Sequence, residues 1–426
     1  MLISPPDVKG HIRERLEAVR RTTLELFESV PDEFLRRRVH SFYSPIGWHF
    51  GHVGRTEEFW VCQATGQAPC DEDLSFLYAD LLENPKDNRV NIPDREGTIA
   101  YLAKTREVAL RALDEAELSS DNPLIKDGYA WEFAIQHECQ HQETITEMLC
   151  LIHKELGPLE VECASWKAAV GTEFLDIPGG HHLMGSEDPY SYDNERPIHE
   201  VHIQPFLLAK TPVTAFQWSR FMADGGYHRP ELWSHEGWRW RTHENVEAPE
   251  YWVSQENGQW AQYGMSGVRA MHPDEPATCL SWFEADAFAR WSEARLPTED
   301  EWEYAASGLV ERIYPWGDTA PSATMANHGR IAGGPMPVDT CSKGASPFGA
   351  LDMAGNCWEW TSSPFLPYPG FAAFPYDGYS KDHMDGHHFV CRGGSWATAG
   401  PILRCSFRNW YVPSYRQGFL GLRLAR

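Results

Sequence analysis

Two histidines in the first half of the chain, His137 and His141, are four residues apart. In an α-helix, side chains at that spacing lie on the same face, one above the other. Two imidazole nitrogens placed in this way can bind one metal ion, and histidine is a common ligand for transition metals. The spacing therefore predicts a metal site on a helix that spans this segment.

A second histidine pair lies upstream, where His49 and His52 follow Trp48 and are also about one helical turn apart. Either histidine can supply a third imidazole from a second helix. Three protein ligands leave coordination positions open for substrates, which distinguishes a catalytic metal site from a structural one. The other histidine of the pair is expected to hydrogen-bond a metal ligand. Glu138 is expected to be either a solvated carboxylate or one that supports a ligand by a hydrogen bond.

The bulk composition limits the class of protein. With 426 residues, 42% of them hydrophobic, the chain is long enough for two globular domains. Its net charge of −24 disfavours a nucleic-acid partner, because phosphate would be repelled. We expect no membrane partner, since no apolar run approaches the roughly 20 residues of a membrane span. Without a signal-peptide pattern, and with ten scattered cysteines and no CxxC pair, the expected location is the reducing cytoplasm.

Four segments in the first part of the chain have apolar residues at helical spacing. These segments are residues 8–30, 48–67, 95–117 and 128–156. The two histidine pairs fall on the second and the fourth. Four helices joined by loops predict a four-helix bundle, a fold that places metal ligands on facing helices.

The composition changes between residues 157 and 169, after which Gly, Pro and Trp are frequent and helical periodicity is rare. Short alternating segments at 174–180 and 200–203 predict strands. Helices are expected at 214–224, 281–294 and 298–307, the second beginning at a serine N-cap with a glutamate three residues later. We expect residues 1–165 to form the helical bundle, and residues 166–426 to form an α+β domain whose irregular loops carry part of the site.

Several phrases of the second half belong together: Glu195-Arg-Pro197, Arg295-Leu-Pro-Thr-Glu-Asp-Glu-Trp302, Gly355-Asn-Cys-Trp-Glu-Trp360, Arg392-Gly-Gly-Ser-Trp396 and Gly421-Leu-Arg-Leu-Ala425. They resemble the formylglycine-generating-enzyme (sulfatase-modifying factor) fold, a loop-rich, C-type-lectin-like domain. The first half, with its WHxxH and HExxH motifs, resembles the DinB-like metal-binding bundle. The tandem of the two is similar to the ergothioneine-pathway sulfoxide synthases and the related selenoneine synthases.

This resemblance implies a non-haem iron enzyme that uses O2 to attach sulfur or selenium to the imidazole of hercynine (Nα-trimethylhistidine). It implies that Fe(II) is held by His52, His137 and His141, with His49 as the less favoured third ligand. Zinc would suit three histidines equally well on ligand grounds. The preference for iron therefore comes from the resemblance alone.

One departure from formylglycine chemistry is visible in the sequence. In the formylglycine generators, two cysteines follow the RGGS motif, whereas here Ala397 and Thr398 are among the residues that follow it and no cysteine stands at either matching place. Cys405 lies further along and is expected to be a core residue. Oxidation of a sulfatase cysteine is therefore disfavoured.

The resemblance also implies residues that contact hercynine, namely Gln140 in the HExxH turn and the pair Asn409-Trp410 near the C-terminus. A trimethylammonium group favours aromatic faces, which suits a tryptophan. Each has a plainer alternative: Gln140 as a buried helix residue, and Trp410 as one core aromatic among 18 tryptophans.

For the chalcogen donor, the resemblance implies an arginine in the bundle, matched by Arg89, and an Asp-Arg clamp after Asn409-Trp410. Here Tyr411 and Tyr415 occupy the clamp positions, and Arg416 stands one place late. Tyrosines hold an amino and a carboxylate group less securely than Asp and Arg would. The broken clamp argues against γ-glutamylcysteine and leaves free cysteine or a selenosugar as donors, with the sulfur donor slightly ahead because Arg89 is present.

A tyrosine near the iron is expected to supply a proton or an electron, because the phenol O–H is a proton donor. The family's tyrosine falls in a loop that here contains Tyr368, Tyr376 and Tyr379. We favour Tyr376, then Tyr379. Rival hypotheses are a thiol dioxygenase or a zinc-dependent thiol transferase that uses only the bundle, and a binding module without catalysis.

Overall fold

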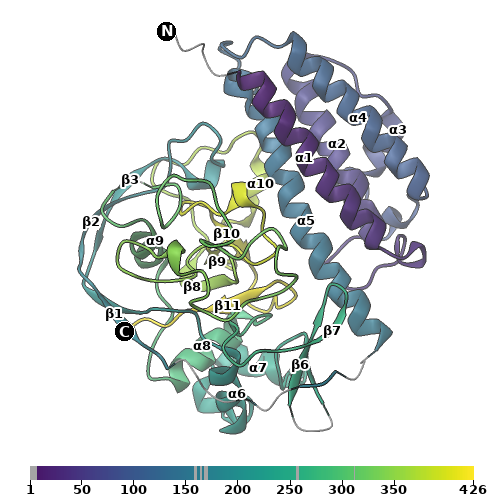
Figure 1. Cartoon of the computed structure of the whole chain (residues 1–426). Helices are drawn as coiled ribbons and strands as arrows, with labels where there is room; N and C mark the ends of the chain where they lie inside the picture. Colours follow the sequence, from purple (N-terminus) through teal and green to yellow (C-terminus); the bar gives the residue numbers. More distant parts are fainter. Residues whose placement is uncertain (1–6, 158–160, 164–165, 167–170, 256–258, 311) are drawn as a thin grey trace. The chain divides into compact units, whose positions relative to one another are not determined.

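The computed structural model describes residues 7–157, 161–163, 166, 171–255, 259–310 and 312–426 (Figure 1). The chain divides into two compact units, Met1–Glu155 and Leu156–Arg426. The predicted domain boundary lies between residues 165 and 166. Residue 165 is outside the described residues, so this boundary stays a prediction.

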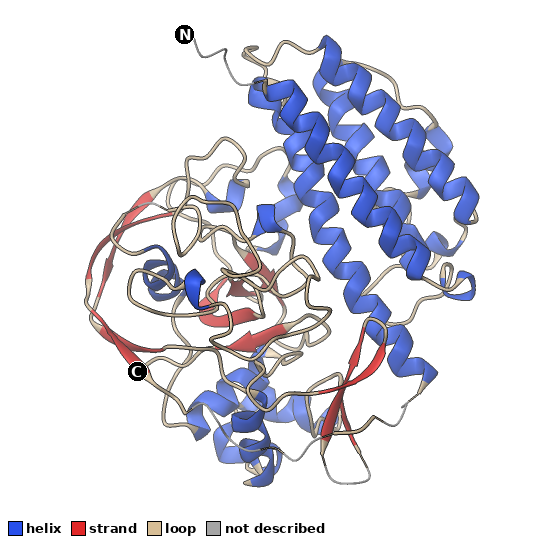
Figure 2. Cartoon of the chain, in the orientation of Figure 1, coloured by secondary structure: helices blue, strands red, loops and turns tan. Residues whose placement is uncertain are grey.

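The first unit is helical, as Figure 2 shows. Its helices are α1 (Val8–Ser29), α2 (Ile46–Thr65), the short α3 (Glu72–Leu77), α4 (Arg95–Glu115) and α5 (Tyr129–Leu156). The four long helices agree with the four predicted segments to within two residues at each end. The sequence analysis did not predict α3, which has only six residues, too few for apolar periodicity to be visible.

Local sequence explains where these helices begin and end. Asp7 accepts a hydrogen bond from the Gly10 amide at the start of α1, and Asp94 does the same for Gly97 at the start of α4. Helix α2 ends at Gly66, whose φ of 74° is the left-handed conformation that glycine adopts without strain. Packing of apolar faces then holds the helices together, with α2 against α4 and α1 against α4.

A buried group of four charges, which we call the ion-pair tetrad, takes one residue from each long helix: Arg20, Glu57, Arg106 and Glu138. Arg20 Nε donates to Glu138 Oε1 at 2.8 Å, and Arg20 Nη2 donates to Glu57 Oε2 at 2.5 Å. Arg106 Nε donates to Glu57 Oε1 at 2.6 Å, and Arg106 also approaches Glu138 at 3.5 Å. Two acids and two bases make the tetrad neutral, so each buried charge has a partner.

The second unit combines short strands, short helices and long loops (Figure 2). Strands β1 (Phe174–Ile177) and β4 (Phe206–Ala209) pair antiparallel, as do β2 (Gly180–Met184) and β3 (His199–Ile203). A three-stranded antiparallel sheet contains β5 (Trp252–Ser254), β6 (Trp260–Gly264) and β7 (Gly267–Ala270). The strands predicted at 174–180 and 200–203 correspond to β1 and β3.

The fourth sheet has the order β10-β9-β8-β11 and contains β8 (Trp358–Pro364), β9 (Phe389–Arg392), β10 (Asn409–Tyr411) and β11 (Leu420–Leu422). Strand β11 runs parallel to β8, and the other pairs are antiparallel. The sheet brings the segment Asn409–Tyr411 beside Phe389–Cys391, so the predicted hercynine residues form an edge strand.

The helices of this unit are α6 (Ala215–Ala223), α7 (His235–His243), α8 (Trp282–Trp291), α9 (Glu299–Ser307) and the four-residue α10 (Asp377–Ser380). Capping boxes at Thr214, Ser281 and Thr298 start α6, α8 and α9, which correspond to the three predicted helices. Helix α7 was not predicted; its strongly polar sequence from His235 to His243 has no apolar stripe. Against α9 packs a core that includes Ile177, Ile203, Phe206 and Leu208.

The motif residues of the second unit hold its loops by buried ion pairs. Arg392 of the RGGSW motif pairs with Glu303, and Arg408 binds Glu299 with both an Nε and an Nη2 donor, at 2.7 and 3.0 Å. Arg423 makes the same kind of two-point contact with Glu359. Bidentate pairs of this kind fix both position and orientation, so Arg408 fixes the backbone next to Asn409 and Trp410.

Within the part of the chain that the structure describes, no helix combines the length and apolar character needed to cross a membrane.

Candidate active site

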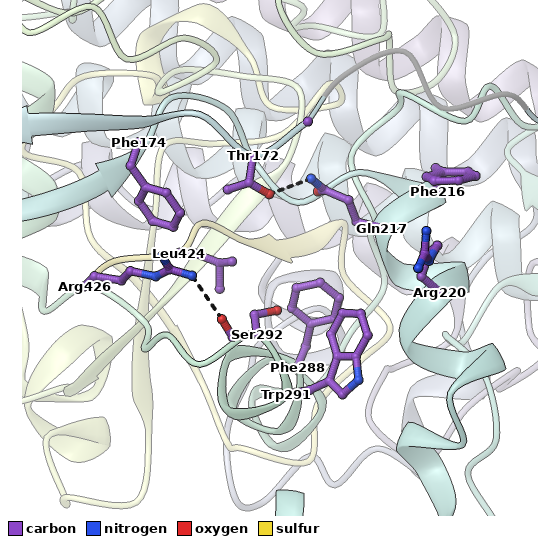
Figure 3. Close-up of a pocket in the computed structure, with 11 residues that line it drawn as sticks. Thr172, Phe174, Phe216, Gln217, Arg220, Phe288, Trp291, Ser292, Leu424 and Arg426 are labelled. Atoms are coloured by element: carbon purple, nitrogen blue, oxygen red, sulfur yellow. Dashed lines mark hydrogen bonds between the residues drawn. The ribbon is translucent and has the colours of Figure 1, made fainter.

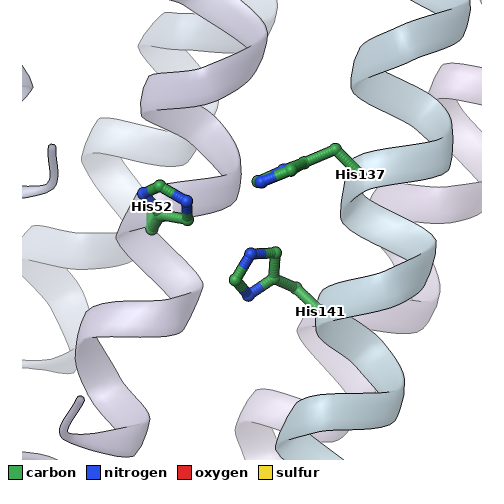
Figure 4. A group of neighbouring side chains, drawn as sticks. All are labelled: His52, His137 and His141. Carbon is green, nitrogen blue, oxygen red and sulfur yellow. The ribbon is translucent and has the colours of Figure 1, made fainter. Parts of the chain in front are cut away.

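Helices α2 and α5 bring together the three histidines that the sequence analysis singled out. Nitrogen atoms of His52, His137 and His141, one from each ring, all lie within 4.8 Å of one another. Figure 4 shows His52 reaching from α2 toward the two histidines of α5. The ring centroids of His137 and His141 are 4.4 Å apart, as expected for residues one turn apart on one helical face. The cluster is the only group of three such side chains among the described residues.

Hydrogen bonds orient two of these rings. His52 Nδ1 donates to the Tyr78 carbonyl oxygen at 2.7 Å, which leaves its Nε2 unprotonated. His141 Nδ1 lies 3.0 Å from His49 Nδ1, so His49 hydrogen-bonds a member of the cluster rather than joining it. A backbone carbonyl or a polar side chain behind each ring is the usual support of a metal-bound histidine.

The third ring has a polar atom with no protein partner. His137 Nδ1 is buried, and no hydrogen-bond partner is found for it among the described residues. A buried polar atom without a partner costs about 1–3 kcal/mol. Three converging imidazoles with such an atom fit a metal ion, and imidazole suits iron as well as zinc, copper and nickel.

The electrostatic environment keeps these imidazoles neutral. Burial lowers the pKa of His52 and His137 well below the ordinary value, and positive charge on neighbouring histidines lowers it further. Burial also lowers the pKa of His141, to about 4. All three rings are therefore uncharged at neutral pH, which is the form that binds metal.

Of the two roles considered for Glu138, the solvated one is wrong. The side chain is 2% exposed and belongs to the ion-pair tetrad. Gln140, by contrast, is half-buried rather than enclosed in the core, and it precedes His141 on α5. The alternative interpretation of Gln140 as a buried helix residue is therefore wrong.

Arg89 lies beside the histidine cluster, in the loop between α3 and α4. Its guanidinium lies 4.4 Å from the ring of Trp48, and Trp48 stacks on His52 with ring centroids 4.3 Å apart. Protein groups already occupy several of its donors: Nε binds the Asn84 carbonyl, Nη1 binds Ser44 Oγ, and Nη2 pairs with Asp80. Arg89 is therefore fixed in place, with its own carboxylate partner.

In the second unit, Trp410 lies in an aromatic cluster. Its ring stacks on Phe365 with centroids 4.2 Å apart and an interplanar angle of 7°. Tyr379 meets it edge-on at 5.9 Å, and His383 lies at 5.7 Å. Trp410 is half-buried rather than a core residue. The sequence analysis missed Phe365 and His383, because each comes from a different loop and no spacing rule connects them to Trp410.

The structure separates the three candidate tyrosines. Tyr368 is buried beneath Arg408, and burial raises its pKa well above the ordinary value. Tyr379 contacts Trp410, whereas Tyr376 contacts Tyr379 and is 43% exposed. Tyr379 is thus the tyrosine that touches a predicted hercynine residue.

The residues at the broken clamp interact with one another and with the core. Tyr411 and Tyr415 stack with centroids 4.1 Å apart. Arg416 is buried and pairs with Glu284 Oε1 at 3.1 Å and Glu250 Oε2 at 3.5 Å. Its guanidinium is therefore engaged inside the second unit.

Cys405 is 3% exposed and part of the apolar core beside α9. Burial, with the nearby Glu303 carboxylate, raises its pKa far above the ordinary thiol value. The thiolate that nucleophilic or redox chemistry needs is thus disfavoured. Cys405 is a core residue, as expected from the sequence.

A pocket of about 380 Å³ lies between β1, α6 and α8 (Figure 3). Aromatic rings form much of its wall, among them Phe174, Phe216, Phe288 and Trp291. Among the described residues that line it there is no imidazole, thiol or carboxylate side chain. None of the predicted site residues lines this pocket, and we assign it no part in the chemistry.

Two family models match the two units of the chain. The family model of the DinB superfamily matches residues 15–145, and that of the sulfatase-modifying factor enzyme 1-like domain matches residues 163–426. Among solved structures, PvdO from Pseudomonas aeruginosa has a TM-score of 0.42 and 22% identity, covering 60% of this chain and 94% of that one. The two family matches confirm the predicted fold class, a helical DinB-like unit followed by a formylglycine-generating-enzyme-like unit.

Two relatives match over nearly the whole chain. The hercynine oxygenase of Mycolicibacterium smegmatis is 38% identical over 436 residues, covering 97% of this chain and 98% of that protein. The hercynine oxygenase of Mycobacterium tuberculosis is 38% identical over 442 residues, covering 100% and 99%. Because this identity extends over nearly the full length of both relatives, the chain belongs to the hercynine oxygenase family.

Proposed function

We propose that the protein is an Fe(II)- and O2-dependent oxygenase that joins a thiol donor to C2 of the hercynine imidazole. The product would be a sulfoxide in ergothioneine biosynthesis, and the second oxygen atom and the two displaced hydrogens would leave as water. The observation that carries this proposal is the cluster of three neutral imidazoles, one buried and two half-buried, in a chain that belongs to the hercynine oxygenase family. The preference for iron over zinc rests on the family, since the ligands suit both.

His52, His137 and His141 would hold the metal, and when bound the Fe(II) would supply the activation of O2. Three protein ligands leave positions for O2 and substrates. The Tyr78 carbonyl and His49 keep two of the rings in the orientation that metal binding needs. Because the rings are neutral at physiological pH, the metal would not have to displace protons from them.

Hercynine would contact Gln140, Asn409 and Trp410. The motif matches suggest these residues, and the aromatic cluster around Trp410 supports the assignment. A trimethylammonium group is attracted to the faces of Trp and Tyr by about 0.5–2 kcal/mol per ring. Trp410 and Tyr379 offer two such rings at right angles, 5.9 Å apart.

The proton donor would be Tyr379, ahead of Tyr376. The sequence favoured Tyr376, but Tyr379 is the one in contact with Trp410, and so with the proposed hercynine site. A group that transfers a proton must come within hydrogen-bond reach of the reacting atom. Tyr376 would then support Tyr379 through their edge-to-face contact.

A second candidate is a selenoneine synthase that uses a selenosugar donor. The observation that favours it is the pair Tyr411 and Tyr415 in place of an Asp-Arg clamp, since tyrosines suit a sugar ring. The two rings stack on each other, however, and Tyr415 is 3% exposed. We therefore propose a direct donor contact only for Tyr411, with Tyr415 and Arg416 as the groups that position it.

The decisive experiment is to incubate the Fe(II)-loaded protein with hercynine and one donor at a time in air, and to identify the product by mass. L-Cysteine, γ-glutamylcysteine and a selenosugar are the donors to compare. A hercynine–cysteine sulfoxide is expected; a selenium adduct would favour the second candidate. If γ-glutamylcysteine gives the highest kcat/KM, our interpretation of the broken clamp is wrong.

The variant His141→Ala provides the control and separates the rival classes. It should lose tight iron binding and product formation together. A thiol dioxygenase would oxidise the donor without consuming hercynine, a zinc-dependent transferase would need neither iron nor O2, and a binding module would form no product. We further propose that the reaction takes place in the cytoplasm, where the ten free cysteines would stay reduced.

A further inference from the structure

The pocket between β1, α6 and α8 combines aromatic walls with two guanidinium groups (Figure 3). Its volume of about 380 Å³ is in the range of pockets that hold small organic molecules. All of its lining residues belong to the second unit, and none of the residues proposed for the oxygenase chemistry is among them. A ligand bound here would therefore take no part in the chemistry proposed for the histidine cluster.

Two aromatic rings of the wall are held in place by their own contacts. Phe288 is buried and stacks on Trp218, with ring centroids 5.0 Å apart and an interplanar angle of 12°. Trp291 lies against Phe288 with centroids 5.4 Å apart, and its Nε1 donates to Asp224 Oδ2 at 2.8 Å. Rings that are already ordered lose little conformational freedom when a ligand packs on them. This wall favours a flat, aromatic ligand.

Arg426 brings a positioned cation to the same pocket. Its guanidinium lies 4.6 Å from the centroid of the Phe174 ring, and its Nη2 donates to the Ser292 carbonyl oxygen at 3.3 Å. Its backbone exchanges two hydrogen bonds with Leu207, at 2.9 and 3.0 Å. Among the described residues, Nε and Nη1 of Arg426 have no partner. These donors can therefore bind a carboxylate without breaking an existing ion pair.

Arg220, on α6, is a second cation of the pocket and is drawn on the opposite side from Arg426 in Figure 3. It is exposed, and its side chain forms no hydrogen bond or ion pair with any residue that the structure describes. Asp224, one helical turn further along, binds Arg229 and Trp291 instead. The chain has 61 acidic and 37 basic residues, yet no carboxylate side chain is among the described residues that line the pocket. The local charge therefore attracts an anion.

We propose that this pocket binds a small aromatic carboxylate, in which a single ring carries a carboxylate a few bonds away. The ring packs against Phe288 and Trp291, and the carboxylate accepts hydrogen bonds from Arg426. Arg220 contributes a second positive charge. A neutral aromatic molecule would leave both guanidinium groups without a partner, and an aromatic amine would be repelled by them. The inference goes beyond the proposed function, because it assigns a ligand to a pocket that the oxygenase chemistry does not use.

The test is a calorimetric binding titration of the full chain with probes that separate the ring from the charge. The probes are 3-phenylpropionate, its neutral amide 3-phenylpropionamide, propionate without the ring, and 2-phenylethylamine with the opposite charge. For the wild type we expect 3-phenylpropionate to bind at least about tenfold more tightly than the amide or propionate, because its carboxylate gains charge-assisted hydrogen bonds. The amine should show no measurable binding at this site.

Replacement of Arg426 tests the cation. Arg426→Gln should weaken the binding of 3-phenylpropionate by about tenfold or more, so that the acid and the amide bind equally well. Arg426→Lys should restore part of the preference. Arg239→Gln, a change of an exposed arginine on α7 that does not line the pocket, controls for the loss of one positive charge and should bind as the wild type does.

Two further variants test the ring contact and the location of the probe. Phe216→Ala removes a half-buried ring of the wall and should weaken the acid and the amide by a similar factor, which leaves the preference for the acid intact. His141→Ala changes the histidine cluster and should leave the affinity for 3-phenylpropionate unchanged. If His141→Ala abolishes the binding, the probe occupies the histidine cluster and the proposal is overturned.

The remaining outcomes also decide the proposal. No binding of 3-phenylpropionate to the wild type, or an unchanged affinity in Arg426→Gln, would overturn it. Circular dichroism checks that each variant is folded. If Arg426→Gln does not fold, the wild-type preference and the Phe216→Ala variant decide together: an acid and an amide of equal affinity in the wild type, or an unchanged affinity in Phe216→Ala, overturns the assignment.

Discussion

Removal of one charge from the ion-pair tetrad is the sharpest test of how the metal site is held. The change is Glu138→Gln, which keeps the size of the side chain but removes its negative charge. Glu138 accepts hydrogen bonds from Arg20 at 2.8 and 3.1 Å. Its loss would leave two guanidinium groups facing Glu57 alone, and so one buried positive charge without a partner.

The expected magnitude follows from this geometry. Breaking a buried pair by removing one partner costs about 3–5 kcal/mol, a large part of the roughly 5–15 kcal/mol that stabilises a typical domain. For a unit of this size, that corresponds to a fall in Tm on the order of 10 °C. The tetrad includes all four long helices, so the loss should affect the whole helical unit and not one helix end.

The assay is thermal unfolding followed by far-ultraviolet circular dichroism, with Glu107→Gln, an exposed acid next to Arg106 on α4, as the matched control. The double variant Glu138→Gln, Arg106→Gln restores neutrality and should lose less than the two single variants added together, by on the order of 2 kcal/mol. If Glu138→Gln melts within about 2 °C of the Glu107→Gln control, the tetrad does not stabilise the bundle as argued.

The tetrad also has a predictable pH dependence. Burial alone would raise the pKa of Glu57, but the guanidinium groups of Arg106 and Arg20 hold it below the ordinary value. A carboxylate with a lowered pKa in the folded state contributes stability at neutral pH. That contribution is lost as the pH falls from the unfolded-state value through the lowered one.

Four further predictions concern the site directly. At pH 6, binding of Zn²⁺ or Co²⁺ should release close to no protons from the three imidazoles, since the pKa of His141 is about 4. An ordinary histidine would be about three-quarters protonated at this pH. Calorimetry in two buffers measures the number of protons released, and a release near two protons would refute the prediction. His49→Ala should weaken metal binding by about 10- to 100-fold without abolishing it, because it removes a hydrogen bond to a ligand; an equilibrium metal titration measures this. Gly51→Ala should lower metal affinity as well, since a Cβ there would lie 2.1 Å from the Tyr78 ring and displace the carbonyl that orients His52; wild-type affinity in the same titration would contradict this. Asn409→Ala should raise the apparent KM for hercynine roughly tenfold with iron content unchanged, and an unchanged KM would remove this residue from the hercynine site.

The sequence predicted best what depends on local spacing. The four long helices and the pairing of His137 with His141 follow from the 3.6-residue period, which the structure preserves. The choice of His52 as the third member of the cluster could not be made by spacing, because His49 and His52 lie on almost the same helical face. The structure separates them through the Tyr78 carbonyl and the Nδ1 contact between His49 and His141.

Contacts between distant segments were beyond the sequence analysis. Asp80 and Arg89 form one pair, and Phe365 and His383 surround Trp410, yet no periodic pattern connects either set. The role of Glu138 was open for the same reason, since its partners Arg20 and Arg106 come from helices α1 and α4. Such contacts can be identified only when the packing of the helices and loops is known. The folding of the loops brings these residues together, and no periodic spacing in the sequence indicates it.

Burial keeps the three imidazoles uncharged, so they can lie close together without mutual repulsion. A buried cation in the same bundle would be costly on its own. The tetrad avoids this cost by pairing Arg20 and Arg106 with the two acids Glu57 and Glu138. Asp80, by contrast, comes from a loop, is exposed and pairs with the buried Arg89. The charges of the tetrad are thus buried and balanced, so the four long helices are joined to one another without a net buried charge in the tetrad.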